Sequence, residues 1–301
     1  MARFGVVATA MVTPFDSSGA LDIDAAVGLA RWLADNGNSG LVVAGTTGES
    51  PVLTDEERLQ LIEAVCSAVT IPVVAGLTTN DTPHSVGLVR HAEALGAAGV
   101  LAVAPYYNRP PQAGLAAHFR AVAEATSLPV MLYDVPVRTG RKISSEVIVE
   151  LCRDVSNIVA LKDAGGNPAE SAAVIAALGS SAEVYSGDDS LTLPLLAVGA
   201  VGLVGVATHW AGRETTAMVD AFFAGDVARA REINAALLAS WAFETGDANP
   251  NPIPAKAMMR VLGHAVGQCR LPMGDAPAGL EDRARAVLAD LRDASVVGAA
   301  A

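Results

Sequence analysis

The sequence of 301 residues is poor in lysine, cysteine and aromatic residues. Lysine and cysteine occur three times each, and aromatic residues make up 4% of the chain, so small aliphatic residues must fill most of the core. Cys66, Cys152 and Cys269 lie far apart and form no CxxC pair, which excludes a disulfide framework and the usual spacing of zinc ligands. No apolar stretch is long enough to cross a membrane. We therefore predict a cytoplasmic protein with no membrane partner.

The chain also lacks a cluster of positive charge. Its formal net charge is −12, and its lysine and arginine residues are spread along the sequence. Binding of nucleic acid requires a basic surface for the phosphates, so we expect no nucleic-acid partner. A small anionic substrate is compatible with this composition, because one local arginine is enough to bind it.

Glycine-containing turns recur before apolar segments. They precede residues 41–44, 100–103 and 203–206, and each follows a helix-like pattern. This order is typical of a helix with a glycine C-cap that leads into a strand buried on both faces. Extended along the chain, the pattern predicts eight strands, near 5–12, 40–44, 72–76, 99–104, 129–133, 158–162, 183–186 and 202–206. Helical patterns alternate with them at 24–36, 54–69, 82–95, 112–126, 144–152, 168–178, 190–198 and 210–224.

Eight strand–helix units predict the α/β class and a (β/α)8 TIM barrel over residues 1–224. An open doubly wound sheet is the alternative, and the absence of GxGxxG after the first strand weakens it. From residue 225 to 301 we predict a C-terminal helical extension that packs on the barrel. Its helical patterns cover 226–245, 254–263 and 280–293, with a proline-rich break at 249–254.

Lys162 directly follows the apolar segment 158–161. Because burial of an ammonium group is unfavourable, a lysine on a buried strand tends to lose its proton. The neutral amine can then attack a carbonyl carbon and form a Schiff base. The alternative is that Lys162 pairs with Asp163 or extends to the surface.

Polar segments follow several of the predicted strands. They include Gly-Thr-Thr-Gly-Glu-Ser at 45–50, Pro-Tyr-Tyr-Asn at 105–108 and Ser-Gly-Asp-Asp at 186–189. In a barrel of parallel strands these segments share the end at which active sites lie. Their common location favours a functional Lys162. As alternatives, 45–48 is only a tight turn, and Tyr106 and Tyr107 are only a surface or subunit-contact pair.

Four further residues at this end have alternative interpretations. Tyr133 is either a core aromatic residue or a proton-transfer group on a strand next to that of Lys162. Arg138 is either an exposed loop charge or a two-point clamp for a substrate carboxylate. Asp188 and Asp189 fit a helix N-cap better than a metal site, because no further ligands follow at regular spacing.

The chain resembles the dihydrodipicolinate synthase and N-acetylneuraminate lyase family over nearly its whole length. The resemblance lies in residues 9–15, 45–50, 105–110, 133–140 and 251–256 and in the lysine strand. It implies a TIM-barrel lyase that forms a Schiff base with pyruvate and needs no metal or organic cofactor. It also implies condensation of pyruvate with aspartate 4-semialdehyde to 4-hydroxy-tetrahydrodipicolinate, in diaminopimelate and lysine biosynthesis.

The resemblance assigns the catalytic roles. Lys162 would form the Schiff base, and Thr47 would hold the pyruvate carboxylate. Tyr133 would transfer protons, and Thr46 would link it to Tyr107, which would enter from a neighbouring subunit.

The resemblance also extends to the substrate pocket and the assembly. Arg138 would bind the carboxylate of the second substrate, and Gly187 and Val204 would line the pyruvate pocket. We therefore expect a homo-oligomer, either a dimer or a dimer of dimers.

Two other functions remain open from the sequence. A pyruvate-dependent aldolase or lyase acting on a sugar acid or hydroxy-oxo acid would share Lys162, Tyr133 and Thr47. A non-catalytic barrel that serves as a scaffold or sensor would be expected to have lost some of these groups. Arg138, together with the tyrosine pair at 106–107, favours the synthase.

Several positions depart from the family pattern. Asp134 stands where the synthase motif usually has Asn. The lysine-feedback site of some relatives uses histidines and a glutamate, whereas this chain has Asp55, Arg58 and His84 at the corresponding positions and retains Asn80 and Tyr106. We therefore expect weak or absent inhibition by lysine.

Overall fold

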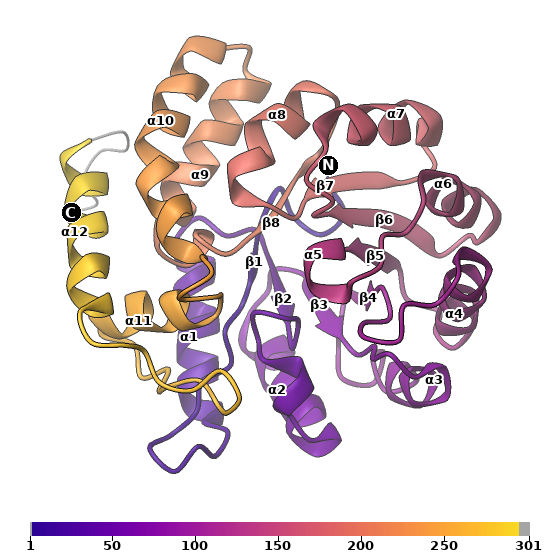
Figure 1. The fold of residues 1–301 in the computed structure, drawn as a ribbon, viewed down its shortest axis with the longest axis horizontal. Coiled ribbons are helices and arrows are strands. Elements are labelled where there is room, and N and C mark those ends of the chain that lie inside the picture. Colours follow the sequence, from indigo (N-terminus) through magenta and orange to yellow (C-terminus); the bar gives the residue numbers. More distant parts are fainter. Residues whose placement is uncertain (1, 295–301) are drawn as a thin grey trace.

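Eight parallel strands form a closed barrel in chain order in the computed structural model, which describes residues 2–294. The strands are β1 (Val7–Ala10), β2 (Gly40–Val43), β3 (Val73–Gly76), β4 (Gly99–Val103), β5 (Val130–Asp134), β6 (Ile158–Asp163), β7 (Glu183–Ser186) and β8 (Gly202–Gly205). β8 pairs with β1, where Ala8 lies opposite Val204, and this pairing closes the barrel. Figure 1 shows the strands at the centre with helices around them. The predicted TIM barrel is confirmed, with each strand where the apolar segments placed it.

Helices follow the strands, and all but one short turn at the barrel mouth cover the outside of the barrel (Figure 1). They are α1 (Ile23–Asp35), α2 (Asp55–Ala68), α3 (Thr82–Val89), α4 (Gln112–Glu124), α5 (Pro136–Thr139), α6 (Ser145–Asp154), α7 (Pro168–Leu178), α8 (Thr192–Ala197) and α9 (Thr208–Phe223). The predicted helix at 82–95 is too long, because the chain continues after Val89 in turns with i to i+3 hydrogen bonds. The single turn α5 was not predicted, since four residues are too few to show helical periodicity. Proline at its first position and Gly140 in the left-handed region after it fix its ends.

Side chains alternate between the barrel interior and the layer under the helices. Met131 and Tyr133 of β5 belong to the interior cluster of apolar side chains, whereas Val130 and Leu132 pack in the outer core. Successive side chains of a strand point to opposite faces, so this alternation follows from strand geometry. It directs Tyr133 inward and its neighbour Asp134 outward.

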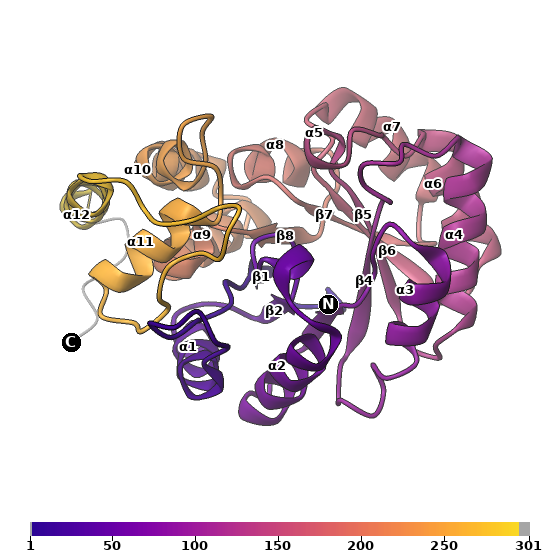
Figure 2. The same cartoon turned by 60° about the horizontal axis from the view of Figure 1, so that its bottom comes forward.

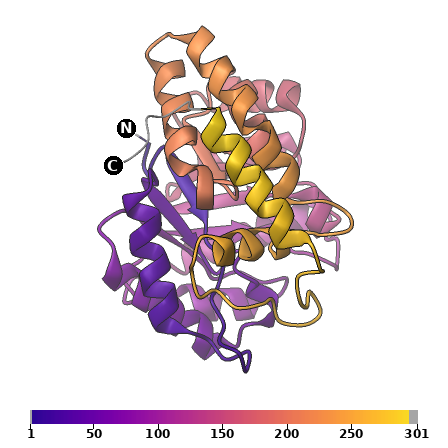
Figure 3. The same ribbon diagram turned by 90° about the vertical axis from the view of Figure 1, so that its left-hand side faces the viewer.

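The chain after α9 folds into three helices on one side of the barrel. These are α10 (Val227–Glu244), α11 (Ile253–Val261) and α12 (Leu280–Asp293). Figure 3 shows α12 lying across α10, and in Figure 2 α11 lies between α12 and the barrel. The predicted helices of the extension are therefore present, while the division of the chain at residue 224 stays a prediction. Within residues 2–294, no helix has the length and hydropathy needed to cross a membrane.

A buried ion pair joins this extension to the loop after β2. Lys256 of α11 places its Nζ 2.6 Å from Oε1 of Glu49, and both side chains are almost fully buried. The backbone N–H of Arg270 donates to the other carboxylate oxygen of Glu49 at 2.9 Å. Lys256 and Arg270 also lie against the ring of Phe15, at 4.2 and 4.1 Å from its centroid. The extension therefore holds the loop that contains Gly-Thr-Thr-Gly at 45–48.

We expect the variant Lys256→Met to lower the free energy of unfolding by about 3–5 kcal/mol, because it leaves the Glu49 carboxylate buried without a cation. Urea unfolding followed by circular dichroism measures the change. The matched control is Asp282→Asn, which breaks the 2.7 Å pair with Arg285 on the exposed face of α12 and should cost at most about 1 kcal/mol. Equal losses in the two variants would contradict a structural role for the buried pair.

Candidate active site

Lys162 and Tyr133 lie side by side inside the barrel. They are register partners on β6 and β5, and the Nζ of Lys162 is 4.3 Å from the centroid of the Tyr133 ring. Lys162 is 4% exposed and Tyr133 is 6% exposed. Lys162 thus neither extends to solvent nor forms an ion pair with Asp163, whose carboxylate accepts from Ser171 and the backbone of Gly165. The structure resolves the alternatives for Lys162 in favour of a buried amine.

Burial changes the protonation of this amine. Desolvation lowers the pKa of Lys162 to about 8, the nearby Asp189 acts in the opposite direction, and Arg138 adds to the lowering. The cause is that an ammonium group loses its hydration inside the barrel. The neutral amine, which is the form that attacks carbonyl carbons, is therefore far more abundant near neutral pH than in a solvated lysine, although the protonated form still predominates at pH 7.

Tyr133 keeps its proton under the same conditions. Burial raises the pKa of its hydroxyl to about 12, and Arg138 and the Thr46 side chain oppose this shift. A phenol that stays protonated next to a neutral amine can donate a proton and take it back during a reaction at that amine.

A cavity of about 500 Å³ opens above these two side chains. The sequence-predicted residues that line it are Thr46, Thr47, Tyr133, Arg138, Lys162 and Gly187. A smaller cavity of about 240 Å³ shares Thr46, Tyr133 and Arg138 and is also lined by Tyr106. Six of the eight predicted site residues therefore meet at one end of the barrel, and they come from four different strand–loop junctions.

Gly187 makes room for the lysine. A Cβ atom at this position would lie 3.0 Å from Cγ of Lys162 and 3.0 Å from Cβ of Ala164, closer than side chains normally approach. Val204 is not among the residues that line the larger cavity, and its place in the pyruvate pocket stays a prediction. It belongs to the apolar cluster in the barrel interior, and Val206, two residues later, lines the cavity instead.

Tyr107 does not reach this cavity within the chain. Its side chain is 90% exposed, and its backbone has φ = 73°, in the left-handed region that residues other than glycine rarely adopt. Its neighbour Tyr106 lines the smaller cavity. The structure therefore separates the two members of the tyrosine pair, and only Tyr106 lies at the site of its own chain.

Asn251 was not among the predicted site residues. It precedes α11, is 5% exposed, and lines the cavity together with Thr47 and Arg138. Its Nδ2 donates to Oγ1 of Thr47 at 2.8 Å, and its backbone carbonyl accepts from Nη2 of Arg138 at 3.2 Å. In the sequence this stretch is a break between helices and, over residues 251–256, part of the family resemblance, but neither interpretation gave Asn251 a role or placed it at the barrel mouth.

Two acidic residues, Asp189 and Glu244, also line the cavity, and the sequence did not predict that they would lie together there. Asp189 accepts from the backbone N–H of Val206 at 2.7 Å, and Glu244 accepts from that of Ala207 at 3.0 Å. Burial raises the pKa of Asp189 to about 6, and burial together with Asp189 raises the pKa of Glu244 well above its usual value. Asp188 caps the short turn after it by accepting from Ser190, so the N-cap interpretation of this segment is confirmed for Asp188.

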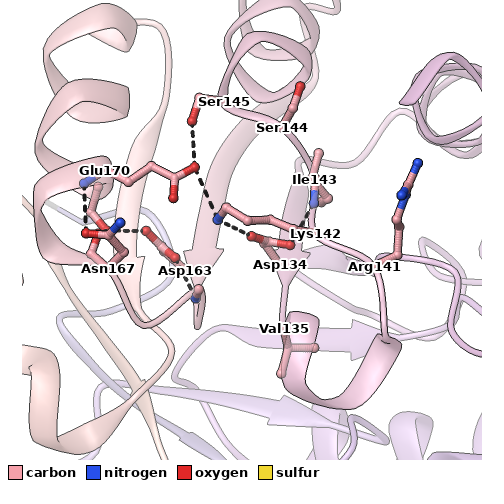
Figure 4. Close-up of polar contacts among 12 residues, drawn as sticks. Asp134, Val135, Arg141, Lys142, Ile143, Ser144, Ser145, Asp163, Asn167 and Glu170 are labelled. Atoms are coloured by element: carbon pink, nitrogen blue, oxygen red, sulfur yellow. Dashed lines mark hydrogen bonds and ion pairs between the residues drawn. The ribbon is translucent and has the colours of Figure 1, made fainter. Parts of the chain in front are cut away.

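Lys142 lies on the outer face of β5 and β6, the two strands that carry Tyr133 and Lys162. Asp134 and Asp163, the next residues on the two strands, are also register partners and point outward. Lys142 lies 3.0 Å from Asp134 and 3.4 Å from Glu170, as Figure 4 shows. A carboxylate at position 134, where the family motif usually has an amide, therefore has a cation to pair with.

Among the described residues, no group of three or more His, Cys, Asp or Glu side chains could hold a metal ion. The polar groups of the cavity are instead hydroxyls, one guanidinium, one amine, one amide and carboxyls. This set suits a small substrate with carboxylate and carbonyl groups.

The model of the dihydrodipicolinate synthetase family matches residues 3–291 of the chain. The chain belongs to this family. It is 52% identical over 281 residues to the 4-hydroxy-tetrahydrodipicolinate synthase of Acidothermus cellulolyticus, covering 92% of this chain and 89% of the relative. The predicted family is confirmed, and so is the prediction that the chain is an enzyme.

Solved structures agree with this assignment. Dihydrodipicolinate synthase from Bacillus anthracis is 43% identical to this chain and superimposes with a TM-score of 0.92. The match covers 96% of this chain and 99% of that one. The enzyme from Cyanidioschyzon merolae, whose structure contains bound lysine, is 42% identical with a TM-score of 0.93, over 97% of this chain and 99% of that one.

We expect the reactivity of Lys162 toward a small amine-acylating reagent to rise with pH and to be half-maximal near pH 8, because only the neutral amine reacts and its fraction increases through the pKa. Competitive labelling followed by peptide mass spectrometry measures this. Lys142 is the internal control, since ion pairing raises its pKa above the usual lysine value. A midpoint for Lys162 as high as that of Lys142 would contradict the claim that burial lowers the pKa of the Lys162 amine.

Proposed function

We propose that this chain condenses pyruvate with aspartate 4-semialdehyde to give 4-hydroxy-tetrahydrodipicolinate. The observation that carries the proposal is the buried Lys162 amine, with its lowered pKa, beside the protonated hydroxyl of Tyr133. The names of the relatives support the same reaction. It would supply a precursor for diaminopimelate and lysine synthesis.

The proposed reaction begins with attack of the Lys162 amine on the keto carbon of pyruvate, and loss of water gives an iminium ion. Loss of a proton from the methyl group yields an enamine, whose carbon adds to the aldehyde of the second substrate. The amino group of that substrate then attacks the imine carbon, closes the ring and releases Lys162. Tyr133 would donate and accept the protons of these steps.

The surrounding residues would bind the two carboxylates. The Thr47 hydroxyl would hold that of pyruvate, and Arg138 would hold that of the semialdehyde through two parallel hydrogen bonds. Gly187 and Val204 would line the pyruvate pocket, where Gly187 would leave space for the adduct. No step of this scheme requires a metal ion or an organic cofactor.

A second copy of the chain would complete the proton path. Tyr107, almost fully exposed, would enter the site of a neighbouring subunit and connect through Thr46 to Tyr133. The 90% exposure of Tyr107, whose ring has no place in the site of its own chain, supports association of copies into a dimer or a dimer of dimers. A cytoplasmic location stays a prediction.

The test of the function uses pyruvate with cyanoborohydride, followed by a panel of second substrates. We expect a reduced pyruvate adduct on Lys162, found by mass spectrometry and absent from Lys162→Met. We then expect turnover with aspartate 4-semialdehyde to exceed that with 2-keto-3-deoxy sugar acids. No adduct would favour a non-catalytic scaffold, and faster turnover of the sugar acids would favour the aldolase.

We expect lysine to inhibit the enzyme weakly or not at all. Asp55 forms a 2.8 Å pair with His84, and the buried guanidinium of Arg58 lies on the same helix as Asp55. The Arg58 guanidinium would repel the side-chain ammonium of a bound lysine, and the Asp55 carboxylate that could attract it is already engaged by His84. A titration of lysine against initial rates checks the expectation, and strong inhibition at submillimolar lysine would refute it.

A further inference from the structure

The starting observation is a hydrogen bond between segments far apart in the sequence. Nδ2 of Asn251, in the stretch between α10 and α11, donates to Oγ1 of Thr47 in the loop after β2 at 2.8 Å. Both residues are buried, at 5% and 4% exposure. The buried pair of Lys256 and Glu49 fixes the same two segments relative to each other, so neither partner is free to turn away.

This hydrogen bond fixes the direction of the Thr47 hydroxyl. An amide NH2 group can only donate, so the oxygen of Thr47 acts as the acceptor and its own proton must point elsewhere. The cavity with Lys162 and Arg138 lies beside Thr47. A carboxylate there can only accept, and its bond from the hydroxyl would be charge-assisted.

The orientation of the amide follows from what surrounds it. Oδ1 of Asn251 is buried and has no partner among the described residues. The reversed orientation would bury the NH2 group there and leave two N–H donors without an acceptor. Leaving two buried donors unpaired costs more free energy than leaving one carbonyl oxygen unpaired. The backbone carbonyl of Asn251 accepts from Nη2 of Arg138 at 3.2 Å, so the residue contacts the groups proposed for both substrate carboxylates.

We propose that Asn251 is a positioning residue that makes the Thr47 hydroxyl a hydrogen-bond donor to the carboxylate of the keto-acid substrate. The inference rests on the proposed function, because it assigns the polarity of a group that this function uses. It also makes the C-terminal extension part of the substrate-binding site.

The decisive variant is Asn251→Asp, which keeps the shape of the side chain but replaces the donor by an acceptor. The Thr47 proton would then bond to the introduced carboxylate and be lost to the substrate. We expect KM for pyruvate to rise about tenfold or more, as loss of a charge-assisted bond implies, with a smaller change in kcat at saturation. Asn249→Asp, which adds the same charge two residues earlier at a position outside the cavity lining, should leave KM near the wild-type value.

A double-mutant cycle separates hydroxyl polarity from simple charge repulsion. In a Thr47→Val background, which has no hydroxyl to orient, Asn251→Asp should raise KM no further. An equal rise in both backgrounds would overturn the inference, and so would an unchanged KM in Asn251→Asp. If thermal unfolding shows that the aspartate variant does not fold, Asn251→Ala replaces it in the same cycle, with the same two outcomes.

The cyanoborohydride adduct distinguishes failure of the inference from failure of the function. Absence of the adduct in the wild-type enzyme would overturn the proposed function. A wild-type adduct combined with either contrary KM result would overturn only the role of Asn251.

Discussion

Burial of the Lys162 amine beside Tyr133 is the constraint on which the rest of the structure depends. An ammonium group inside a barrel loses its hydration, and within residues 2–294 no carboxylate lies within ion-pair distance of Lys162 to compensate it. The protein therefore lowers the pKa of the amine instead of neutralising its charge with a partner. Burial also lowers the pKa of Lys256, the other deeply buried lysine, but there Glu49 pairs with the amine directly and acts in the opposite direction. Two lysines of one chain are thus buried for different purposes, one for reactivity and one for stability.

The surroundings of the amine are arranged in three layers. Inside the barrel, apolar side chains below Tyr133 exclude water. At the mouth, hydroxyls, Arg138 and the Asp189–Glu244 pair line the cavity. Outside the wall, Lys142 pairs with Asp134, directly behind the two strands that carry the reactive residues. Strand alternation connects these layers, because a residue that points inward is followed by one that points outward.

Much of this was predictable from the sequence, for identifiable reasons. Buried parallel strands are continuous apolar runs, so all eight were found, and strand–helix alternation then predicted the barrel and the end that carries the site. The short turn α5 was missed because four residues show no period. Glu244 and Asn251 enter the site from the extension, through contacts between distant segments. The resemblance over 251–256 marked the segment of Asn251 but assigned no role to that residue. Val204 lies in the apolar interior with Tyr133, and Val206, which was not predicted, lines the cavity two residues later.

The small number of lysines makes the central claim directly measurable. Protein labelled with 15N and 13C on its lysine side chains contains only three such groups, and the signal of Lys162 is the one lost in Lys162→Met. We predict that this signal titrates with a midpoint near pH 8 in the absence of substrate. A midpoint above about pH 10, as in a solvated lysine, would contradict the claim that a buried, readily deprotonated amine lies at the base of the site.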